Sequence, residues 1–549
     1  MKRFCVFVLV ALLVCTLGFA ACQPKTETDE LVVYNWADYI YDTKLDDFKE
    51  YYKNLTGREI NVTYVTFDTN ETMLTKIMNG DSVVDVMCPS EYAIQKLLEN
   101  NLLLPLNYFS NNANDYLDTT KLNDYTHNSQ NVDAKFVQKV DEVFDEVTVN
   151  GESGVTTAKM SDYFVPYMYG TLGILYNKQY FEELGIYNRE TMNNANWGLL
   201  FNDDGNGNIL SDGLTGRIYT KDSIRDSYAA TIFYLKESGK LDGLTVQDGA
   251  NKGKLYTELP VGDLINTVDD QVVALCSEAL KTQKEQLYGY EVDFGKNELI
   301  QGIAYVDLAW SGDALYAVEE SWDDDYCDPL LEYDEGESGG YTLGYYVPHG
   351  DGNIWFDGWV VPKTCRNLDA AKIFINFLNE PNVAALNMME IGYTSAVDSE
   401  VVRNNDDCRS ILCEGYLVYA PEYWDVVDED GKPLSEEDCD YASWEEFEEY
   451  FFDYCDVVDD SNWRYPFVIA ENNEYNRSLD DLGVMRDFGA NNHKVVTMWE
   501  DVRSTGITAW ALLIWTLVVV AVVSGVVALW FVLKQRRKMR VIIKHHDEE

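Results

Sequence analysis

Apolar and polar positions alternate with two different periods along the first part of the chain. Short apolar or β-branched runs, which are typical of strands, cover residues 31–34, 60–66 and 83–88. Apolar positions with the helical period, which are typical of amphipathic helices, cover residues 45–55, 71–78 and 91–98. Asn79-Gly80 follows the second of these helical runs as a stop signal. The regular exchange of strand and helix predicts an α/β fold.

The same alternation returns three times further along the chain. It covers residues 173–184, 216–236 and 354–378. Asp222-Ser223 precedes the second helix as a capping signal, and Pro362-Lys363 and Asn367 mark the connection in the third unit. These units extend the α/β prediction over most of the chain.

Three stretches interrupt this pattern. Residues 134–160 are polar and lack sustained periodicity, and residues 321–340 hold many acidic residues among glycines. Residues 404–466 are strongly acidic but also rich in Tyr and Trp and contain four cysteines. Rings and cysteines favour an ordered insertion over low-complexity disorder for this last stretch.

The N-terminus has the pattern of a bacterial secretory signal. Lys2 and Arg3 precede an apolar run, and residues 1–22 end in small residues before Cys22. Two kinds of processing fit this pattern: lipidation of Cys22 as in a lipoprotein, or plain signal cleavage. Residues 23–30 are polar, as expected for a short tether.

A second membrane signal lies near the C-terminus. Residues 507–533 carry no charged side chain. A helix of this length is long enough to cross a hydrocarbon core of ~30 Å. Trp510, Trp515 and Trp530 lie towards its ends, and residues 534–549 begin with many lysines and arginines. Because basic residues stay in the cytoplasm, we expect a cytoplasmic tail and a large outer domain.

Charge and composition exclude several classes of function. The formal net charge of −52 argues against nucleic acid as a partner, and instead favours attraction of cations. The five histidines form no nucleophile–base–acid pattern, and no glycine-rich phosphate loop is present. We therefore expect a protein that is not an enzyme, with no catalytic residues, no cofactor and no metal.

The chain contains 11 cysteines, of which four share the acidic insertion. Disulfides, free thiols and zinc are the alternatives for this cluster; no spacing resembles a zinc finger, and an outer domain permits disulfides. We expect at least one bridge within this set, whose members are Cys408, Cys413, Cys439 and Cys455.

The candidate chemistry lies in three short stretches that pair aromatic rings with a carboxylate. They are Tyr34-Asn35-Trp36-Ala37-Asp38-Tyr39, Trp310-Ser311-Gly312-Asp313 and Trp355-Phe356-Asp357. Ring faces and carboxylates both attract cations. In an extended segment residues i and i+2 point the same way, so Trp36 with Asp38, and Trp355 with Asp357, can face one cavity. Together they predict a site for a flexible organic cation with several charges.

Taken in order, these and other landmarks resemble the spermidine/putrescine-binding proteins of ABC transporters. The resemblance runs from about residue 31 to residue 393 and rests on the order of motifs, none of which is specific alone. The motifs are Val33-Tyr34-Asn35-Trp36, Pro89-Ser90-Glu91-Tyr92, Val165-Pro166-Tyr167 with Gly170-Thr171 and Gly173, Asp222-Ser223-Ile224-Arg225-Asp226, Trp310-Ser311-Gly312-Asp313, Trp355-Phe356-Asp357, Ile373-Asn376-Phe377-Leu378 and Ile391-Gly392-Tyr393.

The resemblance implies a two-lobed, periplasmic-binding-protein-like (type II) α/β fold with mixed sheets, a ligand cleft between the lobes and, here, an added C-terminal transmembrane helix. Residues 31–168 and 355–403 are expected in lobe 1, and residues 169–354 with part of 404–495 in lobe 2. Position by position, the resemblance implies these ligand-binding residues: Trp36, Asp38, Tyr39, Ser90, Tyr92, Asp226, Trp310, Asp313, Trp355, Asp357 and Tyr393. Ala37 and Ser223 stand where some members place polar or acidic groups, so the preferred polyamine stays open.

The implied partners are a polyamine ligand, an ABC permease with its ATPase, and the membrane. The implied location is the outer face of a bacterial cytoplasmic membrane. The alternatives are a membrane-fixed polyamine sensor or adhesin that has lost transport, and a secreted hydrolase that uses paired acids.

Overall fold

The computed structural model describes residues 28–505, apart from 42, 81–82, 152–153, 194, 206, 331–338, 349, 399–400, 403–404, 406–407 and 409–481, together with residues 523–524 and 530. The predicted leader 1–22 and tail 534–549 lie outside these residues, as do nearly all of the acidic insertion and of the predicted span 507–533. Among the helices of the described residues, none has the length and apolar character needed to cross a membrane.

One twisted sheet runs through the whole described structure. Its main path, in spatial order, is β2 (Glu59–Thr66), β1 (Thr28–Asn35), β3 (Val86–Met87), β13 (Gly352–Val360), β6 (Phe164–Asn177), β9 (Val306–Trp310), β7 (Ile218–Lys221) and β8 (Leu287–Glu291). Three short strands join it at the side, namely β12 (Leu343–Tyr346) and β14 (Thr394–Ser395) on β6, and β15 (Leu482–Gly483) on β13. Pairing is parallel at both outer parts and antiparallel around β13 and β6, so the sheet is mixed.

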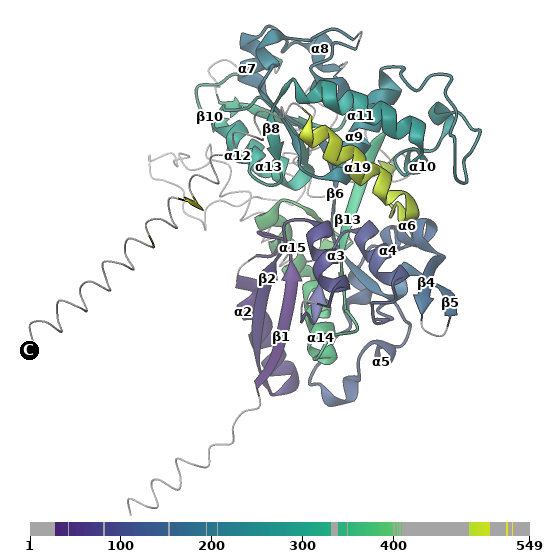
Figure 1. The fold of residues 1–549 in the computed structure, drawn as a ribbon. Coiled ribbons are helices and arrows are strands. Elements are labelled where there is room, and N and C mark those ends of the chain that lie inside the picture. The colour runs from purple at the N-terminus through teal and green to yellow at the C-terminus, as the bar shows by residue number, and fades with distance from the viewer. Residues whose placement is uncertain are drawn as a thin grey trace, which may run out of the picture.

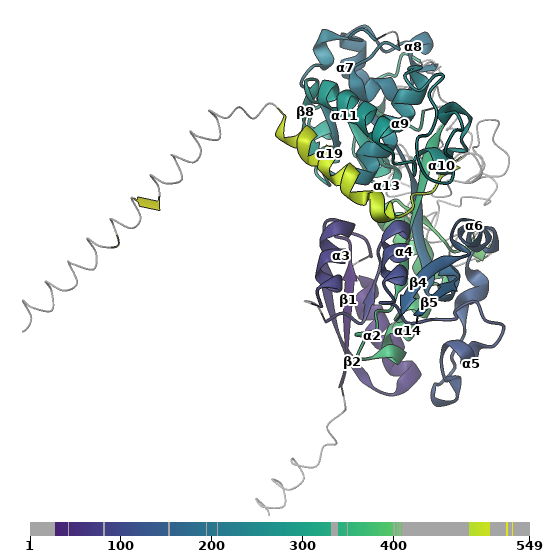
Figure 2. The same ribbon diagram turned by 45° about the vertical axis from the view of Figure 1, so that its right-hand side comes forward.

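The molecule has two lobes, and β6 and β13 run from one into the other (Figures 1 and 2). Both strands are buried along their whole length, as expected where a sheet is covered on both faces. The resemblance implied separate mixed sheets in each lobe, whereas the hydrogen-bonded path is continuous. The predicted lobe boundaries at 168/169 and 354/355 fall within β6 and β13, and they stay a prediction.

The lower lobe in Figure 1 is built on β1, β2 and β3. Its helices are α2 (Thr43–Thr56), α3 (Asn70–Met78), α4 (Glu91–Glu99), α5 (Ala113–Tyr116), α6 (Ala134–Phe144), α14 (Leu368–Leu378) and α15 (Pro381–Ile391), and a hairpin joins β4 (Val147–Gly151) to β5 (Gly154–Ala158). The helices begin where the sequence supplies caps: Thr69 accepts from Thr72 N–H, and Asn367 from Ala370 N–H. Phe48 of α2 stacks edge-on against Phe374 of α14, which closes the core on that side.

The upper lobe is built on β9, β7 and β8 and carries a second set of helices (Figure 2). They are α7 (Lys178–Glu183), α8 (Arg189–Asn193), α9 (Ile224–Glu237), α10 (Val261–Leu264), α11 (Asp270–Lys284), α12 (Gly295–Ile300) and α13 (Ser311–Glu319), with a short pair β10 (Trp322–Asp323) and β11 (Gly340–Tyr341). Helix α9 is buried from Arg225 to Leu235, so it lies inside the lobe.

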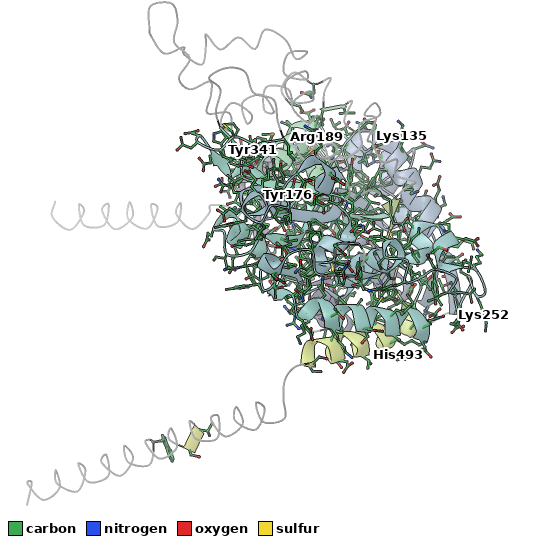
Figure 3. All side chains as sticks on the ribbon, turned by 90° about the horizontal axis from the view of Figure 1, so that it is seen from above. Lys135, Tyr176, Arg189, Lys252, Tyr341 and His493 are labelled. Carbon is green, nitrogen blue, oxygen red and sulfur yellow. The ribbon has the colours of Figure 1, made fainter. Side chains whose placement is uncertain are left out.

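Helix α19 (Asn492–Ser504) lies along α11 on the outer surface of the upper lobe, and Figure 3 shows it from above at His493. The Lys284 ammonium donates to the carbonyls of Val502, Arg503 and Thr505, which satisfies the end of this helix. The segment before α19 reaches both lobes, because Asp487 pairs with Lys96 of α4 while Arg486 pairs with Asp263 of α10. The C-terminal part of the chain therefore connects the lobes a further time.

Most strands and helices predicted from periodicity are present, with two corrections. Residues 134–160, in which we saw no sustained periodicity, form α6 and the β4–β5 hairpin. Phe136, Val140 and Phe144 recur every four residues and are buried. Strand β1 begins at Thr28, so the end of the predicted tether 23–30 belongs to the sheet.

Candidate ligand-binding site

One group of predicted site residues surrounds a buried carboxylate on β13. Asp357 is 4% exposed, and its backbone forms a β-bridge with Ser90 at the start of α4. Among the residues that the structure describes, neither its Oδ1 atom nor the hydroxyl of Tyr39 has a hydrogen-bond partner. Burial raises the pKa of Asp357 to about 7, while the facing hydroxyls of Ser90 and Tyr39 lower it and the Asp226 carboxylate raises it. Asp357 is thus a buried acid that forms no ion pair among the described residues.

Aromatic rings line this carboxylate. The ring centroids of Tyr39 and Tyr393 are 5.4 Å apart, and those of Trp355 and Tyr393 are 5.2 Å apart, both in edge-on geometry. Glycines allow this packing: a Cβ on Gly312 would lie 2.5 Å from the Tyr393 ring, and one on Gly170 would lie 2.8 Å from Trp355. The rings are therefore held in place by close backbone approach.

A second group lies on the upper lobe. Asp226 is in the first turn of α9, where its N–H donates to the Ser223 side chain, and it is 8% exposed. Burial raises its pKa, while Ser223, Lys221 and the Trp310 indole lower it. Trp310 ends β9 and packs against both large hydrophobic cores of the described residues. The two groups are close enough for the Asp226 charge to act on Asp357.

Trp36 and Tyr92, two further predicted site residues, have different surroundings. Trp36 packs on Phe67 with 4.4 Å between ring centroids, and its indole N–H has no partner. The Tyr92 hydroxyl donates to Glu71 Oε1 over 3.1 Å.

Asp38 and Asp313, two further predicted site residues, differ from Asp357 and Asp226 in their surroundings. Asp38 is exposed in a turn with φ of 47°, so the extended geometry that we expected for Trp36 and Asp38 is wrong. Extended geometry does hold for Trp355 and Asp357 in β13. Asp313 is paired with Lys296 over 2.8 Å.

The comparison with known protein families is decisive for the class of this protein. The family model described as bacterial extracellular solute-binding protein matches residues 45–405. The chain belongs to this family.

This solute-binding protein has relatives in several bacteria. The chain is 23% identical over 378 residues to the spermidine/putrescine-binding periplasmic protein of Salmonella typhimurium. The match covers 69% of this chain and 80% of the relative. It is 24% identical over 386 residues to the putrescine-binding periplasmic protein PotF of Escherichia coli, covering 70% and 82%. A solved structure, the putative spermidine/putrescine ABC transporter from Listeria monocytogenes, has a TM-score of 0.51 at 23% identity, covering 86% of this chain and 99% of that one. This likeness supports the two-lobed fold.

Sequence reasoning missed three charged residues of this solute-binding protein. Glu91 accepts from Phe356 N–H over 3.2 Å, and burial raises its pKa to about 8. Arg225 lies over the rings of Tyr92 and Phe488, at 5.2 and 3.5 Å from their centroids. Lys221 is 2% exposed and stands 4.3 Å from the centroid of the Trp310 ring. Glu91 and Arg225 belong to motifs on which the resemblance rests. Only their burial in the folded structure distinguishes them from charged residues on the surface.

Within the described residues, no cluster of His, Cys, Asp or Glu could hold a metal ion. Cys408 is buried, whereas its three predicted partners Cys413, Cys439 and Cys455 lie outside the described residues, as does Cys22.

Proposed function

We propose that this solute-binding protein captures a polyamine outside the cell and delivers it to an ABC permease. The observation that carries the proposal is the environment of Asp357. A carboxylate this deeply buried is unfavourable unless a cation joins it, and the surrounding rings of Tyr39, Trp355 and Tyr393 suit the methylenes next to an ammonium group.

The position of Asp226 supports a ligand with more than one charge. It lies on the opposite lobe beside Trp310, and burial raises its pKa as it does for Asp357. Neither acid forms an ion pair with a lysine or arginine in the part of the chain that the structure describes. A diammonium ligand would bridge the two carboxylates and hold the lobes together.

The relatives named as spermidine- and putrescine-binding proteins support the same ligand class. The net charge of −52 also suits a cationic ligand, since a negative field raises the rate of cation capture at low salt. Acting as a receptor rather than as an enzyme, the protein would bind and release its ligand unchanged.

The ligand-binding residues would then have these roles. Asp357 and Asp226 bind the ammonium groups; Trp310, Trp355, Tyr39 and Tyr393 pack on the methylenes; Ser90 orients Asp357. Trp36 and Tyr92 complete the aromatic surface.

Membrane attachment is a separate part of the proposal. Helix α19 ends at Ser504, and the predicted span 507–533 follows it in sequence. With lipid at Cys22 as a second anchor, such a span would keep the receptor near its permease at a high effective concentration.

Calorimetric titration of the full chain in detergent tests the ligand. Putrescine and spermidine should bind, whereas 1,4-butanediol, which has the carbon chain of putrescine without its charges, should not. Absence of binding by any polyamine up to millimolar concentration would contradict the proposed function.

A further inference from the structure

Near the Trp310 ring, carboxylates of the protein are already paired with lysine side chains. We call this region the acidic side of Trp310. Lys221 at the end of β7 forms an ion pair with Glu291 at the end of β8, and its ammonium donates to Val292 O over 3.2 Å. The same ammonium stands 4.3 Å from the centroid of the Trp310 ring. Ring face, carboxylate and ammonium therefore combine here as they would around a bound polyamine.

Two further carboxylates belong to this side. Asp307 on β9 is 1% exposed, and both its side-chain oxygens lack hydrogen-bond partners within the described part of the chain. Asp313 pairs with Lys296, which also reaches Asp293 over 3.1 Å. Burial raises the pKa of Asp307 well above its ordinary value, and the Glu291 carboxylate raises it further. Lys221 and Lys296 thus form ion pairs with Glu291 and Asp313.

The ammonium of Lys221 keeps its charge in this setting. Burial lowers its pKa, but the carboxylates of Glu291, Asp307 and Asp313 outweigh burial and raise the pKa above its ordinary value. Its charge also acts on Asp226, the acid that we assign to the ligand. A ligand ammonium placed on this side of Trp310 would therefore meet a fixed positive charge.

Asp226 and Asp357 differ from these acids, because they form no ion pair among the described residues. Two unpaired carboxylates match the two charges of a diamine. A triamine would have to place its third ammonium elsewhere. On the Trp310 side of Asp226, the acids that it would meet are Glu291 and Asp313, which Lys221 and Lys296 already pair.

We propose that Lys221 is a specificity-determining residue that makes this receptor prefer diamines over triamines and tetraamines. The inference rests on the proposed polyamine function of the same site. It works by repulsion of the wrong ligand rather than by an added contact to the right one, which is a common route to discrimination between similar ligands.

Titrations of the full chain with putrescine and spermidine test this inference. The parent protein should bind putrescine more tightly. In Lys221→Gln the Glu291 carboxylate loses its partner and can receive the third ammonium, so the affinity for spermidine relative to putrescine should rise about tenfold or more.

Lys221→Gln leaves the buried Glu291 charge unpaired and could therefore impair folding. A second variant keeps the test valid in that case. Lys221→Gln/Glu291→Gln removes both charges. The affinity for spermidine relative to putrescine should still rise, but by a smaller factor than in Lys221→Gln. The matched control is Lys236→Gln, which breaks the ion pair of Lys236 with Asp351 on the same lobe, away from Trp310. This control should leave the ratio of the two affinities unchanged.

The outcomes separate the two proposals. A parent protein that binds spermidine more tightly than putrescine, or a ratio that stays constant in both Lys221 variants, overturns the role of Lys221 and leaves polyamine binding intact. Failure of the parent to bind any polyamine overturns the function itself.

Discussion

Replacing Asp357 with Asn should change affinity and stability in opposite directions. The variant keeps the shape of the side chain but removes the charge that we assign to one ligand ammonium. Loss of one partner of a desolvated charge pair costs ~2–5 kcal/mol, so polyamine affinity should fall about 30-fold or more.

The effect on the ligand-free protein follows from the raised pKa. The pKa of Asp357 is about 7 in the folded protein, against ~3.9 for an unfolded Asp, so the folded state binds the extra proton between these values. Stability therefore falls as pH rises from about 4 to about 7, and above this range the ionised carboxylate costs the folded protein ~4 kcal/mol. At pH 5 the cost is only ~1–2 kcal/mol.

Asn cannot ionise, so Asp357→Asn should raise the melting temperature of the ligand-free protein, and more at pH 8 than at pH 5. Differential scanning calorimetry at both pH values and calorimetric titration at pH 8 measure the two effects on the same samples. Asp242→Asn, an identical change at an exposed position, is the control and should alter neither quantity.

Two results would refute this reasoning. Equal polyamine affinity in parent and variant would remove Asp357 from the site. A variant that melts well below the parent at pH 8 would show that the carboxylate has a structural role in the folded protein.

Three further predictions concern other parts of the chain. Trp310→Ala should weaken polyamine binding by ~1–2 kcal/mol of cation–π energy plus lost contact area, measured by titration; an unchanged affinity would place the ring outside the site. Protease added to intact cells, or to spheroplasts where an outer membrane is present, should remove residues 28–505 and spare the tail 534–549, and resistance of the large domain would contradict the topology. Alkylation of the unreduced, denatured protein, followed by mass spectrometry, should leave at least one pair unmodified among Cys408, Cys413, Cys439 and Cys455, and labelling of all four would exclude a bridge.

The fold was predictable from the sequence wherever a local pattern decides the structure. Strand–helix alternation predicted β1 to α4 nearly at their observed bounds, and Ser223 caps α9 as its sequence indicated. The β4–β5 hairpin was not predictable in this way, since every residue of β5 except Ala158 is exposed and no apolar period marks it. Continuity of the sheet through both lobes also escaped prediction, because it depends on pairing between β6 and β13, which are far apart in sequence.

The candidate site was predictable as a set of residue types, but not in its charge balance. Trp355 and Asp357 lie on one extended strand, as alternation required. The same prediction for Trp36 and Asp38 was wrong, because the chain leaves β1 and turns at Asp38 with a positive φ. Burial of Lys221 depends on its long-range neighbour Glu291, so only the tertiary structure reveals this ammonium behind Trp310.

The continuous sheet has a consequence for how the receptor unfolds. Each lobe looks like a separate domain in Figure 1, yet β6 contributes hydrogen bonds to β13, β9, β12 and β14 along one buried strand. Melting one lobe would expose half of this strand and break the pairing on which the other lobe relies. The two lobes should therefore lose structure in a single cooperative transition, and the amides of β6 should be among the slowest in the protein to exchange with deuterium.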